Sequence, residues 1–73
     1  MKKYAILLER ADNGGWSATA PDLPGLLLAA DTREELLEVA PAAIADHLDA
    51  LRDEGLPTPE PAEFAFAEVS LTS

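Results

Sequence analysis

The hydrophobic and polar positions of this chain follow a strand-like period before the first long helical pattern begins. Residues 3–9 are rich in Tyr, Ile and Leu and predict a first strand. Residues 16–20 alternate, with Trp and Ala on one face and Ser and Thr on the other, which is typical of a strand with one buried face. Residues 26–30 form an apolar run between turn-forming residues, and this run is too short for a helix. We therefore predict a strand at each of these ranges.

Two short segments connect the predicted strands. Asn13-Gly14 is a strong hairpin signal because both residue types tolerate positive φ, so the first two strands should form a hairpin. The segment Pro21-Asp22-Leu23-Pro24-Gly25 contains two prolines, which fix φ and remove two backbone donors. We expect a stiff loop there.

A helix is predicted between Thr32 and Gly55. Thr32 and Glu35 have the spacing of a capping box, and Gly55 suits the left-handed residue that ends a helix. Pro41 removes one intrahelical hydrogen bond, so the helix is either kinked there or divided in two. The apolar stripe keeps its phase across Pro41, which favours one kinked helix. The stripe consists of Leu36, Ala40, Ile44, Leu48 and Leu51.

The remaining residues predict a linker and a fourth strand. Residues 56–61 carry proline at every second position and should be extended and stiff, while residues 63–71 alternate like a strand. A right-handed crossover through the helix would place this strand parallel to the first. The predicted fold is therefore α+β with the element order βββαβ. It has two layers, a mainly antiparallel four-stranded sheet of order 3-2-1-4 and one helix on one face.

The length of 73 residues predicts a single domain covering residues 1–73. A domain of this size buries only about 60% of the surface of its unfolded chain, and without cysteine it has no disulfide to stabilise it. The open face of the predicted sheet then favours a homodimer or a higher homo-oligomer. The lack of cysteine fits a reducing cytoplasm, and no apolar run is long enough for a membrane span or a signal peptide.

The chain carries 14 acidic and 5 basic residues, a net charge of −9. Nucleic-acid affinity depends mainly on Lys and Arg that neutralise phosphates, so we expect no direct binding to nucleic acid. Charge complementarity favours a basic protein partner, whereas the plainer interpretation is that acidity keeps a small protein soluble. Charge alone leaves both interpretations open.

Several motifs, taken in order, resemble the HicB-like antitoxin family of bacterial toxin–antitoxin pairs over nearly the whole chain. They are the hairpin turn at residues 12–15 followed by Trp16, the loop at residues 21–25, the Asp31-Thr32 helix entry with Glu35, and Glu54-Gly55-Leu56-Pro57 with Pro59. Each motif is weak alone, and the resemblance depends on their order and unbroken spacing. Ala30, where the family often has glycine, and Pro41 depart from the pattern.

This resemblance implies a degenerate ribonuclease-H-like fold that has lost catalysis and needs no cofactor. It implies an antitoxin that binds a small, basic, mRNA-cleaving toxin of HicA type and covers its active site. Many members carry a C-terminal DNA-binding module, and we expect a stand-alone domain without one. Two alternatives remain open: a solitary homo-oligomeric regulatory or binding domain without a toxin, and a residual metal-dependent nuclease.

Acidic side chains are the candidates for partner binding, namely Asp22, Glu34, Glu38, Asp46 and Asp49. Asp22 either presents a charge from the stiff loop or closes an Asx turn on its own backbone. The helical acids either form a solvated face or meet a basic toxin. Trp16 is expected to pack at the edge of the core.

No catalytic, cofactor-binding or metal-binding residue is predicted. A two-metal nuclease site needs converging carboxylates, and the centre of the first strand carries none. The acids considered for such a site are Asp12, Asp22, Asp31 and Glu35. His47 has no second histidine to join it and is expected to be structural.

Overall fold

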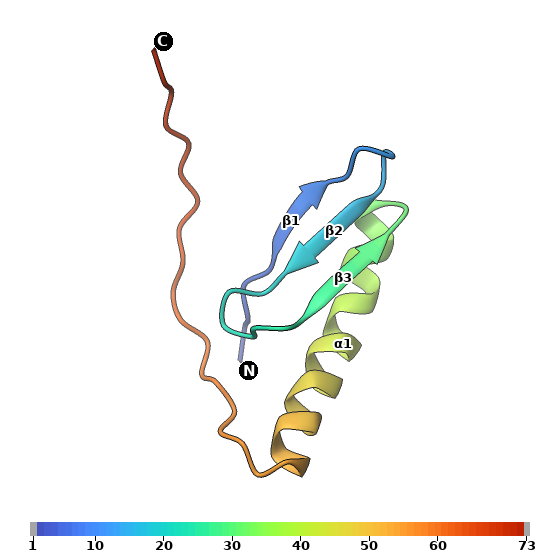
Figure 1. Cartoon of the computed structure of the whole chain (residues 1–73), viewed down its shortest axis with the longest axis vertical. Helices are drawn as coiled ribbons and strands as arrows, with labels where there is room; N and C mark the ends of the chain where they lie inside the picture. The colour runs from blue at the N-terminus through green and yellow to red at the C-terminus, as the bar shows by residue number, and fades with distance from the viewer. Residues whose placement is uncertain (1, 73) are drawn as a thin grey trace.

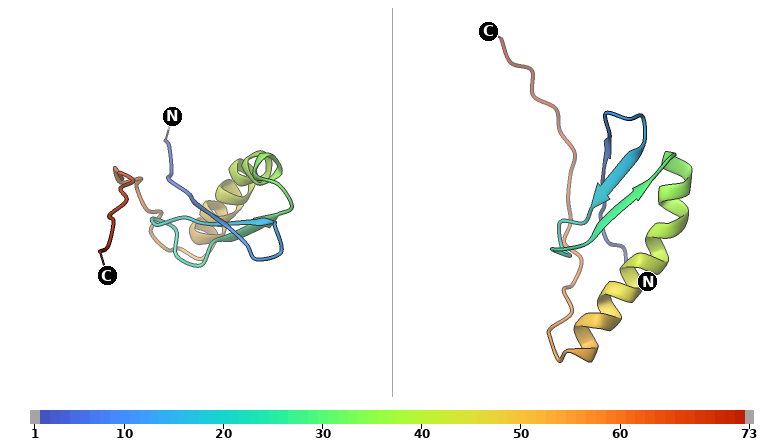
Figure 2. Two further views of the ribbon diagram at one scale, coloured as in Figure 1. Left: turned by 90° about the horizontal axis from the view of Figure 1, so that it is seen from above. Right: turned by 45° about the vertical axis from the view of Figure 1, so that its right-hand side comes forward.

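The computed structural model describes residues 2–72, which fold into an antiparallel sheet and one long helix. Strands β1 (Leu7–Arg10), β2 (Trp16–Thr19) and β3 (Leu27–Ala30) form a sheet of order β1-β2-β3 (Figure 1). Helix α1 (Arg33–Asp53) lies against one face of this sheet, as two further views show (Figure 2). The α+β class and the helix on one face are therefore as predicted.

The first hairpin forms where Asn13-Gly14 predicts it. The Ala11 N–H donates to the Gly15 carbonyl over 2.8 Å, and Asn13 Oδ1 accepts from the Gly15 N–H over 2.9 Å. Gly14 has a φ of 88°, a conformation that residues with a Cβ rarely adopt. The turn therefore sets the register in which Arg10 pairs with Trp16.

Strand β1 is shorter than the predicted range of 3–9. Leu7 pairs with Thr19, the last residue of β2, so a longer β1 would need the residues after Thr19 as partners. Pro21 lies there, and it has no N–H to donate to a ladder. Residues 3–6 consequently precede the strand, and the prediction is corrected to 7–10. Strands β2 and β3 are each one residue shorter than predicted.

The register separates a covered face of the sheet from an open one. Ala18 is 2% exposed and pairs with Leu8 and Leu28, so this row of side chains faces α1. The neighbouring row on the opposite face consists of Leu7, Thr19 and Leu27. Leu27 is 70% exposed, as expected for a face without a second layer.

Among residues 2–72, the two large side chains that are fully buried are Leu23 and Leu36. Leu36 lies in the first turns of α1, where the apolar stripe predicts it. Leu23 lies in the loop between β2 and β3, where its N–H donates to the Ala20 carbonyl and its carbonyl accepts from Leu26. The loop thus folds inward and closes one end of the core, which the alternation of the strands does not predict.

Helix α1 begins and ends at the predicted signals. Thr32 is extended, and its hydroxyl accepts from the Glu35 N–H over 3.1 Å. At the other end, Gly55 has a φ of 72°, and the Leu56 N–H donates to the Leu51 carbonyl over 2.8 Å, as in a Schellman motif. Pro41 lies inside one continuous helix, so the interpretation as a single helix is confirmed. The kink at Pro41 stays a prediction.

The C-terminal segment (residues 56–72) contains no helix or strand. The predicted strand at 63–71 is therefore not formed in this chain, and the sheet has the order 3-2-1 without a fourth member. The physical reason is that a strand needs a neighbour for its backbone groups. Towards its C-terminal end this segment runs apart from β1 (Figure 1). The resemblance to ribonuclease H also stays a prediction.

Candidate functional site

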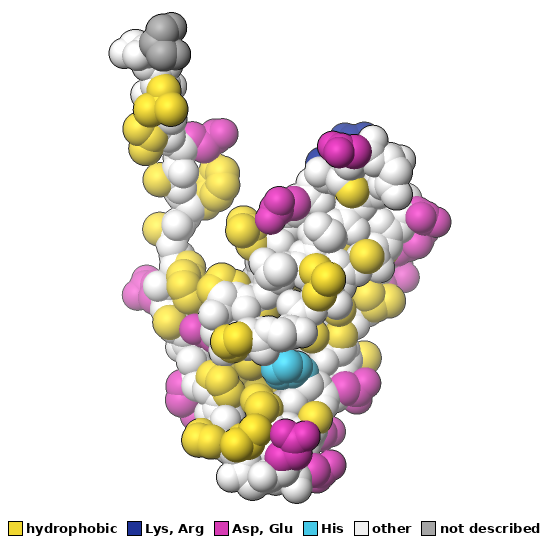
Figure 3. Space-filling view, viewed as in Figure 1, with side chains coloured by type: hydrophobic (Ala, Val, Ile, Leu, Met, Phe, Trp, Pro, Cys, Tyr) yellow, Lys and Arg dark blue, Asp and Glu magenta, His cyan; other side chains and the backbone are white. Residues whose placement is uncertain are grey.

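The acidic side chains of α1 lie on the face of the helix that points away from the sheet. Each helical residue advances about 100° around the axis, which places the acids on the side opposite the stripe that begins at Leu36. Acidic side chains follow the outer margin of α1 in the space-filling view (Figure 3). The exposed acids on this face are Glu34, Glu35, Glu38, Asp46, Asp49 and Asp53. We call these six residues the acidic face.

Few basic side chains interrupt the acidic face. Arg52 donates to Asp49 over 2.9 Å, and both side chains are exposed. Such surface pairs contribute little to stability, about 0–1 kcal/mol. The acidic face brings together four of the five predicted site residues, namely Glu34, Glu38, Asp46 and Asp49.

Asp22 is not part of the acidic face. It lies in the loop between β2 and β3, at the end of the sheet beside the C-terminal segment (Figure 1). Its Oδ2 accepts from the backbone N–H of Ala62 over 2.9 Å. The bond partner of Asp22 is therefore a residue 40 positions away, and sequence reasoning, which offered a local turn or a partner, missed it. No signal within the loop points to this partner.

Two further hydrogen bonds hold the same part of the chain against the N-terminal residues. The Tyr4 hydroxyl donates to the Pro59 carbonyl over 2.6 Å, and Lys2 Nζ donates to Glu60 over 2.8 Å. The hydrogen bond to Glu60 raises the pKa of Lys2 above its ordinary value of 10.5. Together with Asp22, these contacts form what we call the clamp, which fixes residues 59–62.

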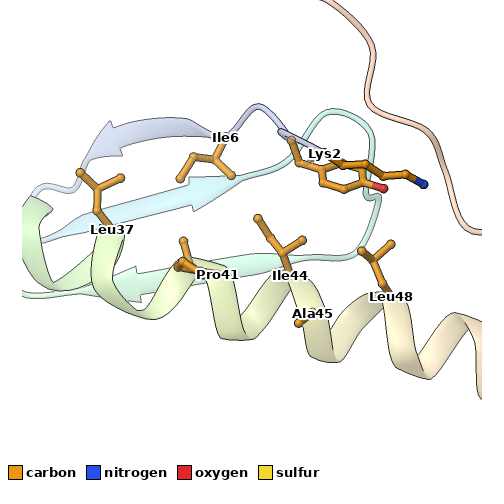
Figure 4. Close-up of a pocket in the computed structure, with 9 residues that line it drawn as sticks. Lys2, Ile6, Leu37, Pro41, Ile44, Ala45 and Leu48 are labelled. Carbon is orange, nitrogen blue, oxygen red and sulfur yellow. The ribbon is translucent and has the colours of Figure 1, made fainter.

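An apolar groove of about 570 Å³ lies between α1 and the N-terminal residues (Figure 4). It exists because α1 packs chiefly over β3 and β2, which leaves the side of the sheet near β1 uncovered. Ile6 and Ile44 face one another across it, and Lys2 lies at its rim. This composition suits an apolar side chain of a protein partner.

The acidic residues considered for a nuclease site do not converge on a common metal-binding position. Within residues 2–72, no group of three or more His, Cys, Asp or Glu side chains is placed to hold a metal ion. Asp31 and Glu35 lie at the start of α1, whereas Asp22 belongs to the clamp. His47 is half-buried on α1.

Trp16 is half-buried, and its side chain lies on the same face of the sheet as the buried Ala18. The guanidinium of Arg10 lies 5.5 Å from the centre of its ring, within the range of a cation–π contact. This agrees with the expectation that Trp16 packs at the edge of the core. Among residues 2–72, no helix combines the length and the hydrophobicity that spanning a bilayer requires.

Comparison with known proteins gives a consistent result. Residues 4–70 match the family described as HicB_like antitoxin of bacterial toxin-antitoxin system. The chain is 33% identical over 72 residues to Antitoxin HicB 1 of Photorhabdus laumondii subsp. laumondii, covering 96% of this chain and 46% of that protein. It is 36% identical over 69 residues to Antitoxin HicB 2 of the same organism, covering 92% of this chain and 49% of that protein. The chain thus spans about half the length of these curated relatives, and it belongs to the HicB-like antitoxin family.

Proposed function

We propose that this protein is the antitoxin of a toxin–antitoxin pair and that it binds and masks a small, basic, mRNA-cleaving toxin of HicA type. The observation that supports this most is the acidic face, a row of exposed carboxylates along one side of a 21-residue helix. The two relatives named as HicB antitoxins support the antitoxin role. In this role the protein acts by binding, without a reaction of its own.

The acidic face gives this proposal a physical mechanism. A ribonuclease holds the phosphates of its substrate with basic side chains, so its RNA-binding surface is positively charged. Glu34, Glu38, Asp46 and Asp49 would meet such a surface and compete with RNA for it. The net charge of −9 would also raise the rate of encounter with a basic partner, and added salt would weaken this effect.

Asp22 has a different role in this proposal. Because its carboxylate already accepts from Ala62, we assign it to positioning the C-terminal segment instead of direct contact with the toxin. Its effect on toxin binding would then be indirect.

A second candidate function is a solitary homo-oligomeric binding domain. The observation in its favour is the exposure of apolar side chains at the C-terminal end, where Phe66, Val69 and Leu71 are 79%, 84% and 88% exposed. Such residues are usually covered by another molecule. Self-association and toxin binding are compatible, since the acidic face and these residues lie on different parts of the chain.

Charge reversal on the acidic face tests the proposed function. Glu38→Lys combined with Asp46→Lys should weaken binding to a purified basic toxin of HicA type by at least about tenfold in calorimetric titration. The matched control, Glu9→Lys with Asp12→Lys on the first hairpin, changes the net charge equally at exposed positions away from the helix. Equal losses for both variants would show that only overall charge matters, and unchanged affinity for the helix variant would refute the role of the acidic face.

A further inference from the structure

The last residues of the C-terminal segment carry the most exposed apolar side chains of the described chain. Beyond the clamp, one side of the segment carries Phe64 and Phe66 followed by Glu68 and Ser70, and from residue 65 onward the other side carries only Ala, Val and Leu. Exposure rises along the segment to 88% at Leu71, and the yellow side chains stand clear of the body (Figure 3). An extended segment that carries apolar side chains on both sides gains stability only when another strand and a core receive it.

Strand β1 offers an edge that can receive such a segment. It pairs with β2 on one side, and within residues 2–72 no strand pairs with its other side. Unpaired N–H and C=O groups on an edge strand are a template for another strand. β1 contains no proline or glycine that would prevent pairing. The uncovered groove beside Ile6 continues from this edge.

The segment does not occupy the edge of its own chain. The clamp holds residues 59–62 near the N-terminal end of β1, and Phe64 and Phe66 still line a small cavity with Ile6 and Leu7. Further on, the segment diverges from β1 (Figures 1 and 2). Nine extended residues reach about 30 Å, more than twice the length of the four-residue β1, so the segment is long enough to span a neighbouring molecule's edge.

Charge favours the pairing of these two elements over other contacts between copies. Among the five basic residues of this acidic chain, Lys3 precedes β1 and Arg10 is its last residue, whereas Lys2 already pairs with Glu60 of the same chain. Residues 63–71 carry two carboxylates, Glu63 and Glu68, and no basic residue. Two molecules with a net charge of −9 repel one another over most of their surfaces, and this pairing brings unlike charges together.

We propose that residues 63–71, the docking strand, add to the edge of β1 in a second copy of this chain. The exchange is mutual, so a two-fold dimer satisfies both edges and both docking strands. Each sheet then has the order β3-β2-β1 followed by the partner's docking strand. One side of that strand then lies on the groove side of the sheet, and the other lies beside Leu7 on the opposite face. This strand exchange would be the interface of the homo-oligomer considered under Proposed function, and it does not depend on toxin binding.

Proline substitutions in the full chain test the proposed ladder. Alternate N–H groups of a strand point to the neighbouring strand, so one of the two variants Ala67→Pro and Glu68→Pro removes a ladder donor at each of two symmetric sites. That variant should weaken the dimer by at least about tenfold in sedimentation equilibrium. The controls Ala67→Thr and Glu68→Asp keep the N–H, the second also keeps the charge, and both should leave the dimer intact. A monomeric wild-type chain, or a dimer that neither proline weakens, would overturn the proposal.

Phenylalanine labelling decides between exchange and pairing within one chain. The two phenylalanines of the protein both lie in the docking strand, so a phenylalanine-labelled copy reports on this strand alone. In a mixture with a differently labelled copy, filtered nuclear Overhauser spectra should connect these rings to residues 7–10 of the other copy. Contacts confined to the same copy would contradict the exchange, even if the protein were a dimer.

Discussion

The helix–sheet body (residues 7–55) and the C-terminal segment differ in the burial of their apolar side chains. In the body, Leu23 and Leu36 are fully buried and the sheet face that carries Ala18 is covered by α1. In the C-terminal segment, Phe66 and Leu71 have almost no cover. Both regions alternate or repeat in sequence as elements should, so pattern alone does not separate them. The difference lies in whether the same chain supplies the surface that receives the side chain.

The two regions should differ most in how a Leu→Ala substitution changes the free energy of unfolding. Leu36→Ala should lower the free energy of unfolding by about 2–5 kcal/mol, because it removes fully buried methyl groups and leaves a cavity. Leu71→Ala should change it by less than about 0.5 kcal/mol at concentrations where the protein is monomeric. Denaturant unfolding of both variants measures this. Similar losses would mean that Leu71 is buried in the isolated chain.

A smaller effect is expected within the body, at Pro41. Pro41→Ala should raise the melting temperature, because alanine restores an intrahelical N–H and is the best helix former. The gain should be a fraction of about 3 kcal/mol, since the native helix has already adjusted to proline. Ala42→Gly, at an exposed neighbour in the same helix, should act in the opposite direction and serves as the control. A lower melting temperature for Pro41→Ala would show that packing requires the proline.

A small effect on stability is expected at the clamp, which joins the two regions. Asp22→Ala removes the acceptor of the Ala62 N–H and should change the free energy of unfolding by about 1 kcal/mol or less. Its main effect should be faster amide exchange at Ala62, measured by hydrogen–deuterium exchange. Asp12→Ala, at an exposed turn position, is the matched control and should leave that exchange rate unchanged. Unaltered protection of Ala62 in Asp22→Ala would mean that the carboxylate does not hold the segment.

The body could be predicted from sequence because its signals are local. Asn13-Gly14 fixes a hairpin. Thr32 and Gly55 mark the two ends of the helix, and each acts only on residues close to it in sequence. The burial of Leu23 was not predictable in this way, since it depends on how the loop packs in the folded chain. β1 was predicted too long because the effect of Pro21 on a strand appears only when the pairing register is known.

The fourth strand and the role of Asp22 depend on residues far apart in sequence. Alternation at 63–71 indicates a strand but not which edge receives it, and a single chain leaves it unpaired. The hydrogen bond from the Ala62 N–H to Asp22 joins two segments that meet only once the chain between them has folded. The acidic face, by contrast, follows from helical geometry alone, so four of its residues were identified from sequence. What that face binds is a matter of partner chemistry that the pattern does not specify.

The most direct test of the proposed function is an RNA cleavage assay with a purified basic toxin of HicA type. Adding the chain should stop cleavage of a single-stranded RNA at a stoichiometric ratio, and the Glu38→Lys, Asp46→Lys variant should require a large excess. The Glu9→Lys, Asp12→Lys variant should inhibit like the wild-type chain. Undiminished cleavage in the presence of excess wild-type chain, or equal inhibition by both variants, would contradict the account.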